Sequence, residues 1–352
     1  MKKTLLAILA TVAMVACSND EIVRQAAPEA IGFDNAFVNN STRSVVTPGY
    51  STTNLFNDFA VYGFVEDAVL FNGTKVANTG ITNTELTSEW KYAGTQYWIA
   101  GANYDFYAVA PFNGNWTIKD ATTPASTGAK ISFTNVDGTQ DLLYSGIVAR
   151  QGVANSNAAV AFTFKHILSR VKFSFENGYN ASAATICVRN IKITNAYATG
   201  VATLGANAAT WGEQNGVIAD GVAFGNATTV ETYATDATEA NLVNYDYAYG
   251  TTIESYFERL LIPGSNEWTI SFVVDLLVSG QKIATYNHTA KATIALAPGM
   301  SYDIKAEITA TNIDPNHAQE PIEFTATMTD WTDATAENNA TVDTIQQGNQ
   351  NN

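Results

Sequence analysis

The feature that most constrains this fold is a series of short segments in which apolar and polar residues alternate, separated by turn-forming residues. Alternation with a period of two is typical of a β-strand that buries one face, and Asn, Gly, Pro and Asp interrupt strands. Convincing helical periodicity is rare in the 352 residues. The strand-like segments include DFAVYGFVE (58–66), NYDFYAVAPF (103–112), VAFTFKHILSRVKFSFEN (160–177), ATICVRNIKITNAY (184–197), EWTISFVVDLL (267–277) and MSYDIKAEIT (300–309). Many short strands joined by turns predict an all-β protein built from antiparallel β-sandwiches.

The N-terminal residues have the pattern of an export signal. Lys2 and Lys3 precede the apolar run TLLAILATVAMVA, which at about 13 residues is too short to cross a bilayer. The run ends at MVAC, where small residues precede Cys17, as in a lipoprotein signal whose cysteine is acylated. We therefore predict a signal peptide over residues 1–16 and a lipid anchor on Cys17. The alternative is an ordinary secretory peptide with an incidental cysteine.

Cysteine content and charge narrow the possible partners. Acylation of Cys17 would leave Cys187 as the only other cysteine, so no intramolecular disulfide is possible. Cys187 lies within TICVRNIKI, where a small buried side chain is expected. Without Lys2 and Lys3, 16 basic residues stand against 33 acidic ones, a net charge of −17. Nucleic acid and anionic membrane surfaces are poor partners for such a chain.

The length left after the signal peptide exceeds what one hydrophobic core usually serves, so we predict two domains. A polar stretch of small residues, RQGVANSNAA (150–159), marks the boundary. The stretch 206–250 is expected to be a loop or excursion within the second domain, with room for one or two short strands, and composition alone favours disorder for the tail. The predicted divisions are a signal peptide at 1–16, a tether at 17–28, an N-terminal sandwich at 29–155, a C-terminal sandwich at 156–331 and a polar tail at 332–352.

The sequence carries no positive signal for an enzyme, a cofactor or a metal site. It contains no H-E-x-x-H, no G-x-S-x-G, no P-loop and no G-x-G-x-x-G after a strand. His166 lies in an alternating apolar segment and is expected to be structural, and His288 is expected at the surface of a strand or hairpin. His317 has Asp314 and Glu320 nearby, but their spacing fits neither an EF-hand nor a zinc site.

Aromatic residues cluster in one part of the first half. They are Trp90, Tyr92, Tyr97, Trp98, Tyr104, Phe106 and Tyr107. Residues of this kind are more often sandwich core and cross-strand pairs, which is the interpretation favoured here. The alternative is a stacking platform for sugars, which would make the chain a monomeric glycan-binding lipoprotein of the cell surface.

Several stretches occur in an order and spacing that is more specific than any one of them. They are the signal ending at Cys17, IGF…STRS (31–44), YDFYAVAP (104–111), DLLYSG (141–146), FTFKHILSRVKFSF (162–175), LLIP (260–263), LAPGMSYDIKAEI (296–308) and IEFTATMTDW (322–331). In these stretches the chain resembles the Bacteroidota fimbrillin family, the Mfa-like, type V pilin-like lipoproteins. The resemblance implies two tandem transthyretin-like sandwiches and a non-enzymatic pilus subunit or adhesin, which is anchored to the outer membrane as a precursor.

The resemblance also implies how such a subunit assembles. In polymerising members of the family, an arginine-specific protease cuts in the loop after the first strand. Carried onto this sequence, the first strand is 30–38 and the cut follows Arg43. Arg24 is the rival site, but it precedes the strand, so a cut there would free the lipid without opening a groove. Without the resemblance, Arg43 would be interpreted as a surface arginine that keeps the loop soluble.

Loss of the first strand would leave a groove for the C-terminal extension of a neighbouring subunit. An edge exposed in this way can be repaired by strand addition. The apolar plug that vacates the groove would be Ile31, Phe33 and Phe37, and the donor candidates in the tail are Val342 and Ile345. An alternative is that the chain is a tip or anchor subunit, which accepts a strand without donating one. The implied partners are other pilin subunits, an arginine-specific protease, outer-membrane lipid through Cys17 and, as an open alternative, a host or glycan ligand.

Overall fold

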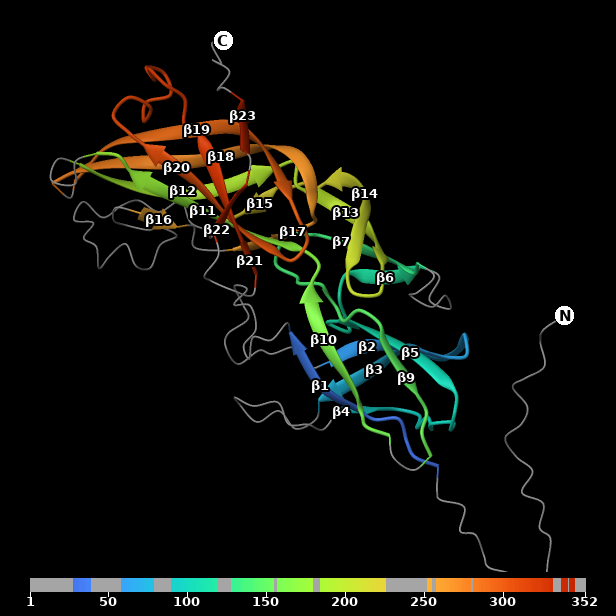
Figure 1. The fold of residues 1–352 in the computed structure, drawn as a ribbon. Coiled ribbons are helices and arrows are strands. Elements are labelled where there is room, and N and C mark those ends of the chain that lie inside the picture. Colours follow the sequence, from blue (N-terminus) through green and yellow to red (C-terminus); the bar gives the residue numbers. More distant parts are fainter. Residues whose placement is uncertain are drawn as a thin grey trace, which may run out of the picture.

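The described part of the chain consists of strands and turns. The computed structural model describes residues 28–38, 58–78, 90–119, 128–154, 157–179, 184–225, 252–254, 258–279, 281–331, 337–340 and 342–345. Within these ranges there is no helix, so the predicted all-β class is confirmed, while the transthyretin-like detail stays a prediction. Among the same residues, none forms a helix that could cross a membrane. The molecule is elongated, with β-structure at both ends (Figure 1).

The first sheet has a pairing pattern that closes on itself. Its order is β2-β3-β4-β1-β10-β8-β5-β9, and β2 also pairs with β5. The strands are β1 (Phe33–Val38), β2 (Asp58–Val65), β3 (Ala68–Asn78), β4 (Trp90–Tyr92), β5 (Asn103–Ala110), β8 (Leu143–Tyr144), β9 (Val148–Gln151) and β10 (Val160–His166). Because β2 pairs with both β3 and β5, β1 is an inner member of a ring of paired strands, with β4 on one side and β10 on the other.

Strands β2 and β5 are buried on both faces, which explains their nearly continuous apolar sequence. On β2, Phe59 belongs to the cluster inside the ring, whereas Tyr62 belongs to a second cluster outside it. Gly63 is on the inner face, where an added Cβ would lie 2.7 Å from the ring of Phe71 and 2.9 Å from that of Phe106. A residue without a side chain is therefore needed at this position for the two rings to approach the strand.

A four-stranded sheet covers the outer face of the ring. Its order is β14-β13-β7-β6. The strands are β6 (Trp116–Lys119), β7 (Lys130–Thr134), β13 (Tyr197–Leu204) and β14 (Ala209–Val217). Phe133 of β7 and Leu204 of β13 share a buried cluster with Tyr62 and Tyr107 of the ring. This sheet joins strands from both sides of the stretch 150–159, and the domain division predicted there stays a prediction.

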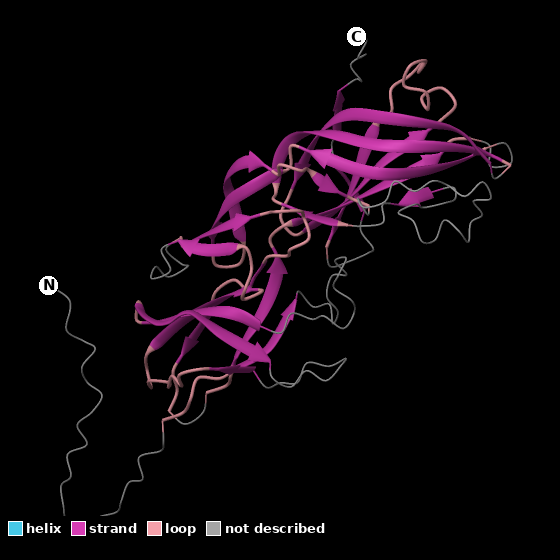
Figure 2. Ribbon diagram, turned by 180° about the vertical axis from the view of Figure 1, so that it is seen from behind, coloured by secondary structure: helices cyan, strands magenta, loops and turns pink. Residues whose placement is uncertain are grey.

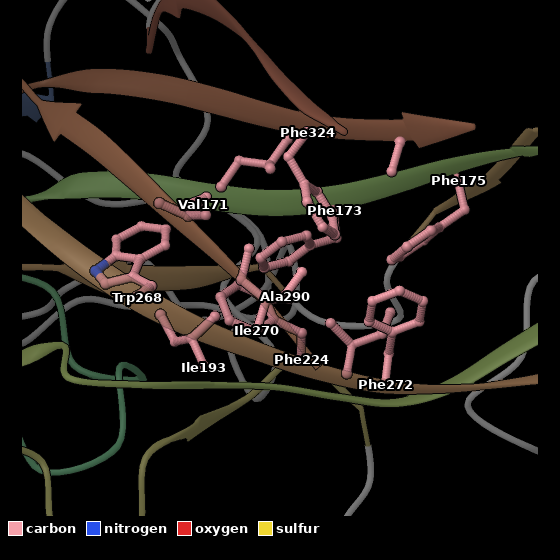
Figure 3. Close-up of a cluster of buried hydrophobic side chains, with 14 of the residues drawn as sticks. Val171, Phe173, Phe175, Ile193, Phe224, Trp268, Ile270, Phe272, Ala290 and Phe324 are labelled. Atoms are coloured by element: carbon pink, nitrogen blue, oxygen red, sulfur yellow. The ribbon is translucent and has the colours of Figure 1, made fainter. Parts of the chain in front are cut away.

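Two further sheets form the C-terminal sandwich. One has the order β16-β11-β20-β21-β22, with β17 also on β11, and the other has the order β15-β12-β18-β19-β23. The strands are β11 (Ser169–Asn177), β12 (Thr185–Thr194), β15 (Val222–Ala223), β16 (Thr252–Glu254), β17 (Arg259–Leu261), β18 (Gly264–Val278), β19 (Gln281–Leu296), β20 (Met300–Ile308), β21 (Phe324–Asp330), β22 (Glu337–Ala340) and β23 (Val342–Ile345). Between the sheets, Phe173 and Phe175 of β11 face Phe272 of β18 (Figure 3).

One stretch of chain connects the ring to the sandwich. Strand β10 lies in the ring and β11 in the sandwich, and only Ile167 and Leu168 separate them. Both linking residues are buried in the cluster between the ring and the four-stranded sheet. The burial of β10, and of the first part of β11, alternates along the strand as the apolar pattern of this sequence does. At the link between β10 and β11, the chain passes from one end of the molecule to the other (Figure 2).

Candidate functional site

The place that β1 occupies in the ring is the candidate functional site. Phe33 of β1 pairs with Trp90 of β4 in antiparallel register. On the other side, β1 runs parallel to β10, and the pairs extend from Phe33 opposite Val160 to Val38 opposite Phe164. The register shifts once along this pair, so β1 carries a bulge. Since both edges of β1 are paired, its removal would leave unpaired backbone groups on two neighbouring strands.

The segment just before β1 is held by backbone hydrogen bonds from both sides. The amide of Ile31 donates to the carbonyl of Gln96 at 2.8 Å, and the amide of Trp98 donates to the carbonyl of Glu29 at 2.9 Å. On the opposite side, the amide of Val160 donates to the carbonyl of Gly32 at 2.8 Å. These bonds use main-chain atoms alone, so they hold an extended chain of any sequence.

The side chains of Tyr92 and Asn157 also form hydrogen bonds to the segment that precedes β1. The hydroxyl of Tyr92 donates to the carbonyl of Ile31 at 2.8 Å, and burial raises the pKa of Tyr92, which keeps this donor protonated. The amide and the side-chain nitrogen of Asn157 both donate to Oε2 of Glu29, at 2.9 and 2.7 Å. Asn157 also closes a short loop onto Val153 through its own side chain. Glu29 is therefore held by two donors of a single residue.

Two apolar side chains at the start of β1 enter the core of the ring. Ile31 is 1% exposed and Phe33 is 3% exposed. The aromatic rings around Phe33, with centroid separations of 5.4–6.4 Å, are Phe59, Phe71, Tyr92, Phe106 and Phe162. Burial of such a side chain contributes about 1.5–3 kcal/mol, and edge-on aromatic pairs add about 0.5–1.5 kcal/mol. We call the surroundings of β1 the β1 seat: residues 90–98, residues 157–164 and the rings of Phe59, Phe71 and Phe106.

The structure places some of the predicted site residues and not others. Ile31 and Phe33 lie in the β1 seat, and the backbone of Phe37 pairs with Thr163, while the side chain of Phe37 lies outside the described atoms. Cys17 and Arg43 also lie outside the described residues. Their roles, and the role of β1 as a removable plug, stay predictions.

The polar residues that hold the start of β1 could not be predicted from the sequence. In the sequence, Tyr92 stands out only as a member of an aromatic cluster, and Glu29 only as the first residue of the predicted N-terminal domain. Asn157 was one of several small polar residues in a proposed linker. No local pattern marks these residues, because each acts on a partner far away in the sequence.

The tail folds back onto its own sandwich where it is described. Strand β22 pairs with the edge strand β21, and β23 pairs with the edge strand β19 of the other sheet. In the second pair, Val342 lies opposite Ile294 and Ile345 lies opposite Lys291. The tail was expected to be disordered on composition alone, and these two strands correct that expectation for residues 337–340 and 342–345.

The aromatic cluster is core, as the favoured interpretation held. Trp90, Trp98, Tyr104, Phe106 and Tyr107 are buried, whereas Tyr92 is half-buried and Tyr97 is exposed. Trp98 packs edge-on against Tyr104 with ring centroids 4.8 Å apart. A flat stacking platform for a sugar needs exposed ring faces. The buried members of this cluster therefore give no support to glycan binding.

Among the described residues, the other side chains that could be reactive or bind a metal form no catalytic or metal site. Burial raises the pKa of Cys187 to about 12, so its thiol is unreactive. His288 was expected at the surface, and this was wrong: it is 2% exposed and stacks on Phe272 in the sandwich core. His317 is exposed and contacts only the neighbouring Asp314 among the ion pairs found. No group of His, Cys, Asp and Glu suited to a metal ion occurs in the described part of the chain.

The comparisons with known proteins agree with this architecture. The sequence profile of a family described as fimbrillin-like matches residues 42–331. The chain belongs to the fimbrillin-like family. No curated protein matches it in sequence. Membership of this family confirms the resemblance stated from the sequence and supports a pilus subunit or adhesin at the cell surface, a structural role.

Solved structures of similar fold include fimbrial proteins. A fimbrial protein from Bacteroides vulgatus is similar with a TM-score of 0.52 and 16% identity, over 86% of this chain and 99% of that chain. The fimbrial anchor protein Mfa2 from Porphyromonas gingivalis is similar with a TM-score of 0.39 and 11% identity, over 87% of this chain and 98% of that chain. The first of these likenesses supports the fold of this fimbrillin-like chain.

Proposed function

We propose that this fimbrillin-like chain is a fimbrial subunit assembled by donor-strand exchange after proteolysis at Arg43. The precursor is a lipoprotein anchored in the outer membrane through Cys17. After the cut, β1 leaves its seat, and a strand from another subunit takes its place. The tail, with Val342 and Ile345 as its apolar residues, is the candidate donor to a neighbouring subunit.

The position of β1 is the observation that carries this proposal. It is an inner strand of the ring, yet it comes from the extreme N-terminal part of the fold, and Arg43 separates it from β2 in the sequence. One cut between β1 and β2 would therefore release an inner strand without breaking any other strand of the ring. The empty seat would expose backbone groups of β4 and β10 and the apolar core around Phe33, which together favour refilling by a strand.

Cleavage and assembly are tested together with the purified full chain and an arginine-specific protease. We expect one cut after Arg43, followed by ladders that resist detergent without heating when a donor subunit is present. The Arg43→Gln variant is expected to stay intact and monomeric, whereas the matched Arg24→Gln variant behaves as the wild type. If the wild-type chain is cut elsewhere first, or is cut at Arg43 and its seat never takes up a strand, the proposal is wrong.

Lipid attachment is tested separately in cells that export the chain. Incorporation of a labelled fatty acid is expected in the wild type and absent in the Cys17→Ala variant. The Cys187→Ala variant is the matched control and is expected to keep the label, because its thiol is buried in the folded chain. A label that persists in Cys17→Ala would overturn the anchor.

A further inference from the structure

We infer that the strand which replaces β1 is not residues 332–352 of a second copy of this chain but a strand of another subunit whose side chains match the β1 seat. The incoming strand carries a branched aliphatic residue, followed two positions later by an aromatic residue. This inference rests on the proposed strand exchange and specifies its partner. It follows from the shape of the β1 seat and from the sequence of the tail.

The seat requires two large apolar side chains on the same face of the strand. Ile31 and Phe33 are two residues apart, and successive side chains of a strand point to opposite faces, so both enter the core of the ring. Phe33 stacks on Phe162 at 5.9 Å and meets Phe71 edge-on at 5.5 Å. A smaller or polar residue there would leave an unfilled space between these rings, and a cavity in a packed core weakens the fit strongly.

The seat also prefers a hydrogen-bond acceptor two residues before the aliphatic position. Glu29 fills this role by accepting two hydrogen bonds from Asn157. The position between the two apolar residues has room for a side chain to begin: a Cβ at Gly32 would lie 3.6 Å from Cβ of Ala159, an ordinary contact. The side chains that this site selects, at the positions of residues 29, 31 and 33, are therefore a hydrogen-bond acceptor, an aliphatic residue and an aromatic residue, whereas the positions of residues 30 and 32 are not selected.

The tail of this chain does not contain that pattern. Residues 332–352 include no Phe, Tyr or Trp. Val342 and Ile345 are three residues apart in the sequence, so a regular strand would carry them on opposite faces. The best alignment places Asp343 at the Glu29 position and Ile345 at the Ile31 position, but it puts Gln347 where Phe33 lies.

The tail also has a place on its own sandwich. Strands β22 and β23 cover the edges of β21 and β19, one in each sheet. An uncovered edge presents unpaired backbone groups that attract other strands, so the tail protects both sheets of its own domain. The misfit with the seat is what separates residues 332–352 from the seat of an identical chain, and a tail that donates elsewhere would first have to leave these two edges.

The first test grafts the tail sequence into β1 of the full-length chain. The graft carries Glu29→Asp, Ala30→Thr, Gly32→Gln and Phe33→Gln, and the matched control carries the first three changes and retains Phe33. Hydrogen exchange of the β10 amides, including Val160, reports whether the seat is filled. We expect the control to exchange nearly as slowly as the wild type and the graft to exchange about a hundredfold faster or more. Equal exchange in graft and control would overturn the aromatic requirement.

The second test separates this inference from the proposed function. The chain cut at Arg43 is mixed with labelled peptides that correspond to residues 29–38, to residues 343–352 and to residues 343–352 with Gln347→Phe. We expect exchange with the first and third peptides and not with the second. Equal uptake of the natural tail peptide would overturn the inference and leave strand exchange standing. If no peptide enters, the proposed exchange itself is wrong, and the inference falls with it.

Discussion

The indole ring of Trp331 stacks on the imidazole ring of His166, with centroids 3.7 Å apart and planes inclined by 8°. His166 is the last residue of β10 in the ring, and Trp331 follows β21 of the C-terminal sandwich. The guanidinium of Arg170 lies 5.4 Å from the centre of the same indole, and Oδ2 of Asp141 lies 2.8 Å from Nδ1 of His166. This contact joins the two ends of the molecule at the residue that precedes the tail.

Replacement of Trp331 is expected to weaken this junction. Trp331 is 8% exposed, so Trp331→Ala removes a large buried ring and should lower the free energy of unfolding by about 3–5 kcal/mol. Trp331→Phe keeps a ring against His166 and should lose clearly less. Urea denaturation followed by circular dichroism measures both values. Equal losses in the two variants would show that the stacking contact contributes nothing of its own.

His288 should make the chain less stable in acid. Burial is the main cause that lowers its pKa from 6.5 to about 4, against smaller opposing effects of Ile313 and Asp314. The unfolded chain therefore takes up the proton first, so the stability is complete above pH 6.5 and falls as the pH drops toward 4. The loss should reach about 3 kcal/mol.

The His288→Phe variant tests this origin because an aromatic ring can still stack on Phe272. Its free energy of unfolding, measured as a function of pH, should lack the loss between pH 6.5 and 4. The His317→Gln variant removes an exposed histidine and should keep the slope of the wild type. If His288→Phe retains the full acid loss, another group is responsible.

A buried ion pair should be costly to break on one side only. The side chain of Asp275 is 0% exposed, and its Oδ2 lies 2.8 Å from Nε of Arg189. Thr285 donates a further hydrogen bond to Oδ1 at 2.5 Å. Arg189→Met leaves the carboxylate without its cationic partner and should cost about 3–5 kcal/mol of stability. The double variant Arg189→Met with Asp275→Leu should recover most of the loss, and a double variant as unstable as the single one would contradict this account.

Cys187 should serve as a probe of unfolding. It is fully buried, and its pKa is raised to about 12, chiefly by burial and further by Asp275. In the Cys17→Ala background, a maleimide reagent should leave the folded chain unlabelled and modify one thiol after denaturation in urea. Mass spectrometry measures both states. Labelling of the native chain at a rate close to that in urea would show that β12 opens readily.

Much of the secondary structure could be predicted because alternation reports burial directly. The burial of β10 alternates residue by residue, as the sequence VAFTFKH suggests. The same alternation, followed strictly along β19, also predicts the buried position of His288. It shares its face of β19 with Ala290, Ala292 and Ile294, all buried, so strict alternation would have placed it in the core. The polarity of the imidazole outweighed the register in the prediction.

The sequence by itself determined that the chain is all-β and located many of its strands, because alternation depends on side chains a few residues apart. It did not locate β14 or the two strands of the tail. Only the tertiary structure decided which strands are neighbours: β1 beside β10, β2 beside β5 to close the ring, and β7 beside β13 across the proposed boundary. Strand pairing uses backbone groups that all residues share. The choice of partner is therefore made by packing between distant side chains, such as Phe33 and Phe162, and leaves no local trace in the sequence.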